Sequence, residues 1–140
     1  NEPFPEWNII TDLKSAQVLF SRCPVPVIAS GFEIGTALPY PNKSIEEDFP
    51  DKLKNPLCIS YSHWGEMPYD RPTWDLTSVL VVAEPEKGYF RLSPQGKIRI
   101  DEQGNSIFSP DEEGMHRFLI LDDSNKESIT TSLVKAVTNR

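Results

Sequence analysis

The sequence predicts an α/β fold that carries an antiparallel β ribbon, and three observations lead to this class. Apolar residues recur at three- and four-residue spacing in residues 13–20 and 76–83, which is typical of amphipathic helices. Residues 25–30 are apolar and β-branched, and they directly follow the first of these helices. After Pro85 the pattern changes to short alternating segments that are separated by glycine-containing turns, as in an antiparallel ribbon.

Length and composition fit one globular domain over residues 1–140, with 38% hydrophobic residues. The net charge of -7 argues against nucleic acid or an anionic membrane as a partner. We expect no membrane-spanning segment, because no apolar run approaches the required length. The spacing of Cys23 and Cys58 suggests neither a disulfide framework nor a zinc site, so both are expected to be small buried side chains.

The first elements are a helix and a strand. We expect residues 6–10 to supply part of a first strand, and Thr11 and Asp12 to mark the start of a helix that Pro24 ends. The apolar face of this helix consists of Leu13, Ala16, Leu19 and Phe20. The uniformly apolar residues 25–30 then predict a strand covered on both faces, as in a parallel sheet.

The middle of the chain is predicted to be mainly a connection followed by two helices. Residues 32–54 contain three prolines and a solvated acidic run, which favours irregular structure. Asn55 and Pro56 predict the cap and first turn of a helix. Its inward face consists of Leu57, Cys58, Tyr61 and Trp64. Pro72 and Thr73 open the next helix, and its buried stripe consists of Leu76, Val79, Leu80 and Ala83.

The last third of the chain is predicted to form strands and one helix. Residues 89–92, 97–100 and 106–108 alternate as ribbon strands, and residues 117–121 form one more strand. Residues 124–127 match a capping box that opens a final helix. Its inward residues are Ile129, Leu133, Ala136 and Val137.

Asp75 is the first candidate site residue, because it lies in the first turn of a predicted helix. Backbone N–H groups and the helix dipole orient a carboxylate at such a position. Two interpretations follow: the carboxylate caps the helix, or it is a fixed, ionised ligand for a metal and a polyhydroxyl substrate.

Two further groups of residues are candidates. Glu6 and Asn8 are two residues apart, so in an extended segment both face the same way and can hold sugar hydroxyls. The alternative is a polar strand end that caps a loop. Tyr61 and Trp64 could stack on a flat ligand while His63 carries a proton. The alternative there is that the two aromatic rings belong to the core and His63 faces solvent.

The order of these segments resembles the inosine–uridine nucleoside hydrolase family. Residues 6–9 and 12–20 look like the family's Glu-aromatic-Asn and Asp-Pro-x-Ala-Ala patterns, and residues 25–35 are similar to the strand and loop that follow. Residues 71–80 look like the family's His-Asp helix start, and residues 97–121 lie where the family has its ribbon. The resemblance covers nearly all of the chain. It implies the C-terminal half of an open sheet with flanking helices plus the ribbon.

That family hydrolyses the N-glycosidic bond of ribonucleosides to free base and ribose, in purine and pyrimidine salvage, with a bound Ca²⁺. The resemblance implies that Asp75 is a Ca²⁺ ligand that also contacts the ribose diol. It implies that Glu6 and Asn8 hold ribose hydroxyls, and that Tyr61 or His63 lies over the base, near the leaving group.

Three features depart from the family pattern. Trp74 stands near the leaving group where many members carry a histidine, and Leu13 replaces a proline. The family's N-terminal aspartate cluster, which supplies most calcium ligands and the catalytic base, is not in this sequence. Asp75 alone cannot supply the roughly six to eight oxygen ligands that calcium takes.

We therefore expect the C-terminal portion of a ribonucleoside hydrolase that is inactive until a missing N-terminal half or a partner chain completes it. The chain begins at Asn1 rather than Met, which fits a part of something longer. Exposed strand edges and apolar faces would then favour a homo-oligomer. The alternative is a non-catalytic module that binds a nucleoside or sugar, or that packs against a partner.

Overall fold

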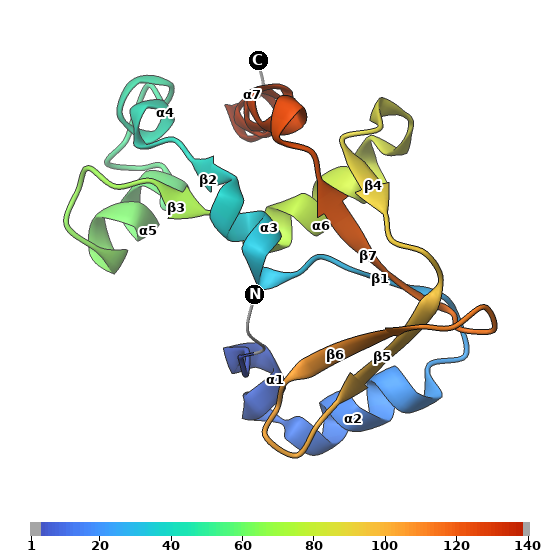
Figure 1. The fold of residues 1–140 in the computed structure, drawn as a ribbon. Helices are drawn as coiled ribbons and strands as arrows, with labels where there is room; N and C mark the ends of the chain where they lie inside the picture. Colours follow the sequence, from blue (N-terminus) through green and yellow to red (C-terminus); the bar gives the residue numbers. More distant parts are fainter. Residues whose placement is uncertain (1–3, 139–140) are drawn as a thin grey trace. The chain divides into compact units, whose positions relative to one another are not determined.

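The computed structural model describes residues 4–138, and within them helices accompany a mixed β sheet (Figure 1). The predicted α/β class with an antiparallel ribbon is confirmed. The chain divides into two compact units: Asn1–Phe32 with Arg91–Ile120, and Glu33–Phe90 with Leu121–Arg140. The single domain over residues 1–140 stays a prediction beside this division. Within residues 4–138 no helix has the length and apolarity needed to cross a membrane.

The first unit is built on a mixed sheet with strand order β1, β7, β5, β6, in which β4 pairs with β7. The strands are β1 (Val27–Ala29), β4 (Phe90–Leu92), β5 (Gly96–Ile100), β6 (Ser106–Pro110) and β7 (His116–Leu121). β1 runs parallel to β7, whereas β5 is antiparallel to both β6 and β7. The predicted ribbon is therefore the β5–β6 hairpin, and the third predicted ribbon strand, β4, joins β7 instead.

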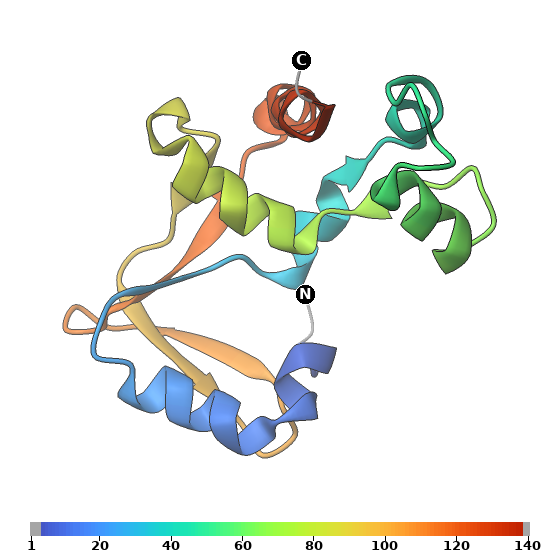
Figure 2. The same cartoon turned by 180° about the vertical axis from the view of Figure 1, so that it is seen from behind.

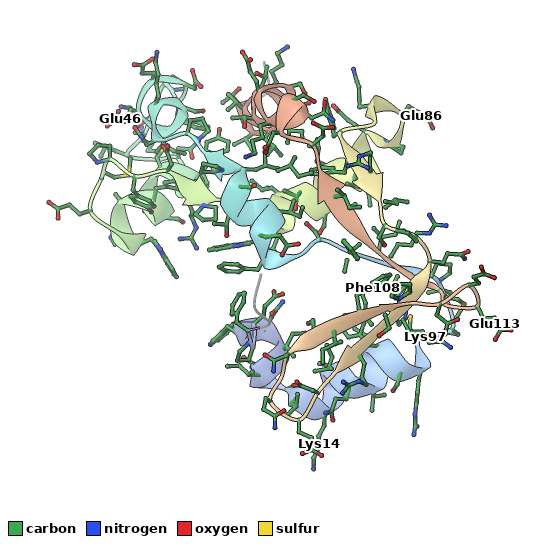
Figure 3. The ribbon with its side chains drawn as sticks, viewed as in Figure 1. Lys14, Glu46, Glu86, Lys97, Phe108 and Glu113 are labelled. Atoms are coloured by element: carbon green, nitrogen blue, oxygen red, sulfur yellow. The ribbon has the colours of Figure 1, made fainter. Side chains whose placement is uncertain are left out.

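Side chains of β7 contact both strands of this hairpin. Phe108 of β6, labelled in Figure 3, meets Phe118 of β7 edge-to-face with ring centroids 4.9 Å apart. His116 is buried, and its Nδ1 accepts the Ile98 amide at 2.8 Å. Its ring also meets Phe20 edge-to-face at 5.9 Å. His116 is thus a structural residue of the sheet, in agreement with its position next to a predicted strand.

The structure has a helix, α1 (Trp7–Thr11), where the sequence predicts part of a strand, so that prediction is wrong. The Ile9 and Ile10 amides both donate to the Glu6 carbonyl at 3.0 Å, which turns the chain into a helix at once. A short apolar run suits a helix or a strand equally well, and its pattern alone does not decide between them.

Helix α2 (Leu13–Arg22) is confirmed, and it lies along the β5–β6 hairpin in both Figure 1 and Figure 2. Asp12 caps it by accepting the Ser15 amide at 3.0 Å and the Ser15 hydroxyl at 2.7 Å. Gln17 Nε2 donates to the Asp101 carbonyl at the end of the hairpin, 3.2 Å away. Leu19, predicted to face inward, is 54% exposed.

Strand β1 confirms the parallel pairing predicted for residues 25–30 but not the covering of both faces. β1 lies at the edge of the sheet order, and Ile28 is 50% exposed. Apolarity alone does not distinguish a central strand from an edge strand, because both sides of an edge strand can be apolar.

Residues 32–54 are not the irregular connection that the sequence predicts. They contain α3 (Phe32–Ala37), β2 (Pro39–Tyr40) and α4 (Asn42–Glu47). Leu38, Tyr40 and Ile45 are buried, so the segment contributes to the core of the second unit. Pro39 is the first residue of β2 and Pro41 is the N-cap of α4, which is consistent with proline at an edge strand or before a helix.

Helix α5 (Pro56–Trp64) begins as predicted: Asn55 Oδ1 accepts the amides of Leu57 and Cys58 at 3.0 and 3.3 Å. Its buried residues Cys58 and Tyr61 join Tyr40 and Ile45 in one core cluster. Strand β3 (Arg71–Pro72) then pairs with β2 and leads directly into the next helix.

Helix α6 (Trp74–Ala83) forms as predicted but buries a different face. Thr77 and Leu80 are buried, whereas Val79 and Val82 are 62% and 81% exposed. The helix is apolar nearly all round, so the sequence pattern carries little information about which face packs.

The remaining elements of the second unit are η1 (Pro85–Lys87), which follows α6, and η2 (Asp123–Asn125) and α7 (Lys126–Thr138), which follow β7. Ile129 and Leu133 of α7 are buried, as predicted, whereas Ala136 is exposed and Val137 is half-buried. The predicted capping box does not form. Asp122 accepts the Ser124 amide at 3.1 Å, and the 3₁₀ turn precedes α7.

Candidate functional site

Asp75 lies in the first turn of α6, as predicted, and its side chain is not used by the fold. The N-cap of α6 is Thr73, which makes no side-chain cap hydrogen bond. Asp75 is exposed, and among residues 4–138 its carboxylate has no hydrogen bond or ion pair. Asp75 therefore caps no amide through a hydrogen bond, although its charge lies where the helix dipole favours it, and its carboxylate is available to a ligand.

The start of α6 is held in place by α3 and by Leu38, which follows it. The Thr73 amide donates to the Gly35 carbonyl at 3.1 Å, and the buried Thr73 hydroxyl donates to the Leu38 carbonyl at 2.7 Å. Gly35 packs so tightly against Trp74 that a Cβ at Gly35 would come 2.5 Å from the Trp74 Cα. These contacts fix the backbone that carries Asp75.

Of the aromatic candidates on α5, Tyr61 is a core residue. It is buried, stacks on Tyr69 with ring centroids 5.4 Å apart, and meets Tyr40 edge-to-face at 6.5 Å. Burial is the main cause that raises the pKa of Tyr61 to about 12, with the nearby Tyr69 phenol adding to it. A neutral, buried phenol of this kind contributes mainly packing.

His63 and Trp64 lie on the exposed side of α5. The His63 Nδ1 is 2.9 Å from the Ile59 carbonyl oxygen, which requires the proton on Nδ1 and leaves Nε2 to accept from solvent or a ligand. Trp64 is 71% exposed, and the Arg71 guanidinium lies over its ring, 4.1 Å from the centroid. This cation–π pair joins α5 to the strand that precedes α6.

Glu6 and Asn8 do not form the extended pair that the sequence predicts. Glu6 occupies the N-cap position of α1, and Asn8 lies inside the helix, where its Oδ1 accepts the Ile9 amide at 3.0 Å. Residues two apart on a helix point in widely different directions. Both belong to the first unit, whereas Trp74, Asp75 and the α5 residues belong to the second.

The donor set does not by itself make a calcium site. Among residues 4–138 no group of three or more His, Cys, Asp or Glu side chains could hold a metal ion. Asp75 offers two carboxylate oxygens where calcium takes roughly six to eight ligands. The described residues therefore do not fit Ca²⁺ alone, and further ligands would have to come from outside them.

The sequence does not predict a second cluster of hydrogen-bonded side chains, which consists of Glu84, Tyr89 and Ser132. Glu84 Oε2 accepts from the Tyr89 hydroxyl at 2.8 Å and from the Ser132 hydroxyl at 3.1 Å. These hydrogen bonds, the one from Tyr89 first, lower the pKa of Glu84. The cluster lines a polar cavity of about 740 Å³, which Lys87 and Lys135 also line. Glu84 and Ser132 are too far apart in the sequence for any local pattern to reveal this contact.

The sequence matches no protein-family model and no curated protein. The resemblance to nucleoside hydrolases therefore rests on the segments quoted above and on the position of Asp75.

Proposed function

We propose that this chain is the C-terminal portion of a ribonucleoside hydrolase, which cleaves the N-glycosidic bond to free base and ribose. The observation that carries the proposal is the Asp75 carboxylate, which is exposed, fixed on a rigid helix start and unused by the fold. The resemblance of the surrounding segments to that family gives this carboxylate its role.

In the completed enzyme, Asp75 would contribute carboxylate oxygens to the bound Ca²⁺ and to the ribose diol. Its place in the first turn of α6 lets backbone N–H groups and the helix dipole orient the carboxylate. The other calcium ligands and the catalytic base would come from the missing N-terminal half or a partner chain, so the isolated chain would be inactive.

The exposed side of α5 would face the base. His63 suits this position better than Tyr61, because the His63 ring is exposed and the Tyr61 ring is buried. In the neutral His63 ring, Nε2 accepts a proton but cannot donate one, so donation to the departing base would need the doubly protonated form. Trp74 next to Asp75 has no acidic proton to give, so leaving-group protonation would fall to another residue.

The exposed apolar residues of α6 support an incomplete assembly. Val79 and Val82 are largely exposed, and Leu76 is 36% exposed. A row of apolar side chains on one helix face is typical of a surface that another chain covers. The missing half or a second copy in a homo-oligomer would be that chain.

The test is complementation. The chain is joined behind, or mixed with, the aspartate-rich N-terminal half of a nucleoside hydrolase, and release of free base from inosine and uridine is measured with Ca²⁺. We expect activity in the complemented protein and a loss of at least about 100-fold in kcat/KM for Asp75→Asn. The matched control is Glu86→Gln, which also removes an exposed carboxylate from the first turn of a helix. Equal activity in the two variants would refute the role of Asp75.

A non-catalytic binding module is the second candidate, and Trp74 in place of the family's histidine favours it. The same complemented protein separates the two functions. Calorimetric binding of Ca²⁺ and ribose without any base release would support the module and refute the hydrolase.

A further inference from the structure

The cavity beside Glu84 lies at the end of α6 opposite Asp75. Glu84 is the C-cap of α6, and Asp75 lies in its first turn. Nine residues of helix place the two positions roughly 13 Å apart along the axis. The cavity therefore differs from the site proposed for the hydrolase, and all of its walls belong to the second unit.

Glu84 presents one unused carboxylate oxygen in this cavity. Both of its side-chain hydrogen bonds, from Tyr89 and Ser132, end on Oε2. Within residues 4–138 no donor bonds to Oε1. Because the two hydroxyls lower the pKa of Glu84, the carboxylate is ionised at neutral pH and held in one orientation. Such an oxygen is a strong acceptor for a charged donor, because charge-assisted hydrogen bonds are about twice as strong as neutral ones.

Two lysines and a second carboxylate, that of Glu127, line the same cavity. Lys87 lies on η1 and Lys135 on α7, and neither takes part in a salt bridge within residues 4–138. Lys135 follows Ser132 by one helical turn, so the two side chains start roughly 5–6 Å apart on one face of α7. Lys87 lies close enough to Glu84 to help lower the pKa of that carboxyl, and the cavity lining holds two charges of each sign.

We infer that this cavity binds a small zwitterion, with its ammonium group on Glu84 Oε1 and its carboxylate on Lys135 and Lys87. A simple anion would lie beside the carboxylates of Glu84 and Glu127, and a simple cation would meet the two lysines. An apolar ligand would remove water from all four charged side chains without replacing it. A ligand that carries both charges can place each of them beside a group of the opposite sign.

The experiment is an NMR titration of this chain, labelled with ¹⁵N, with glycine as the minimal zwitterion. We expect saturable shifts of the amide signals of residues 84–89 and 124–136. Methylammonium and acetate, which each carry one half of the glycine charge pattern, should bind at least about tenfold more weakly. Acetate that binds as tightly as glycine would overturn the zwitterion in favour of an anion site, and no saturable shift with any probe would overturn the site itself.

Variants test the assignment of each charge. Glu84→Gln keeps an oxygen that can accept from Tyr89 and Ser132 but loses the charge, and Lys135→Met keeps the aliphatic stem. Each should weaken glycine binding at least about tenfold in a protein whose remaining amide spectrum is unchanged. The control is Glu86→Gln: Glu86, labelled in Figure 3, is exposed on η1 beside the cavity but is not part of its lining. Unchanged affinity in Glu84→Gln would refute the inference. The titration needs no second half of a hydrolase, so its outcome is independent of the proposed function.

Discussion

Gly35 lies in direct contact with Trp74, so close that a Cβ on Gly35 would come within 2.5 Å of both the Cα and the Cδ1 of Trp74. The neighbouring Thr73 amide donates to the Gly35 carbonyl. A glycine on α3 therefore determines where α6 begins and, through it, where the Asp75 carboxylate is displayed.

We expect Gly35→Ala to destabilise the chain by about 1–3 kcal/mol, because the added methyl group meets backbone atoms that cannot rotate away. The free energy of unfolding from urea titrations followed by far-ultraviolet circular dichroism measures this. The control is Gly65→Ala, where the new methyl group would lie 3.4 Å from the Tyr69 ring, an ordinary contact. Equal free energies of unfolding in the two variants would show that α3 and α6 can move apart without destabilising the chain.

Asp12 and Asp75 both lie at helix starts, but only Asp12 is used by the fold. Asp12→Ala removes the acceptor of the Ser15 amide and hydroxyl and should lower the urea midpoint clearly. Asp75→Ala removes only a dipole interaction and should cost less than about 0.5 kcal/mol. A cost for Asp75→Ala equal to that for Asp12→Ala would return Asp75 to a capping role.

The buried Tyr61 predicts a loss of stability in alkali. Its pKa is raised by burial from its ordinary value of 10.0 to about 12 in the folded chain, so the phenol ionises first in the unfolded chain. The stabilisation is fully present below pH 10 and is lost between pH 10 and 12, by up to roughly 2 kcal/mol. Tyr61→Phe should lack this alkaline loss of stability, because phenylalanine has no group to ionise. The variant loses no hydrogen bond, since within residues 4–138 the Tyr61 hydroxyl donates none. Urea titrations at pH 9 and pH 11.5 compare the two proteins, and identical pH dependence would contradict the prediction.

Glu84 predicts the opposite behaviour, at acidic pH. Hydrogen bonds from Tyr89 and Ser132 hold the pKa of Glu84 below its ordinary value of 4.5. Its stabilisation is therefore present above pH 4.5 and is lost as the pH falls through the lowered pKa. A ¹³C NMR titration of the Glu84 carboxyl measures this pKa directly. Tyr89→Phe removes the larger cause and should raise the pKa toward 4.5, whereas an unchanged value would show that the hydroxyl does not bind in solution.

Elements with strong local signals could be predicted from the sequence. Asp12 and Asn55 are caps whose side chains bond to amides within three residues, so their helices begin where the pattern places them. The β5–β6 hairpin was predictable for the same reason, since its turn is closed by Asp101 and Asn105 within the turn itself.

Features that depend on contacts distant in sequence could not be predicted. The start of α6 is fixed by Gly35 and Leu38, more than 30 residues away, and the helix itself is apolar nearly all round. α4 is favoured by Asp70, whose carboxylate accepts from the Asn42 amide 28 residues away. At the candidate site, the position of Asp75 in the first turn of the helix was predictable. That its carboxylate accepts no hydrogen bond was not, because the helix start is held by the contacts of Thr73 with residues distant in the sequence.

The exposure of Trp64 also has an optical consequence. Trp64 and Trp7 are 71% and 78% exposed, so two of the three indoles already emit from an aqueous environment in the folded chain. Unfolding should shift the intrinsic fluorescence maximum only slightly. A flat emission profile in denaturant would therefore reflect the placement of these indoles and would not show that the chain had failed to fold.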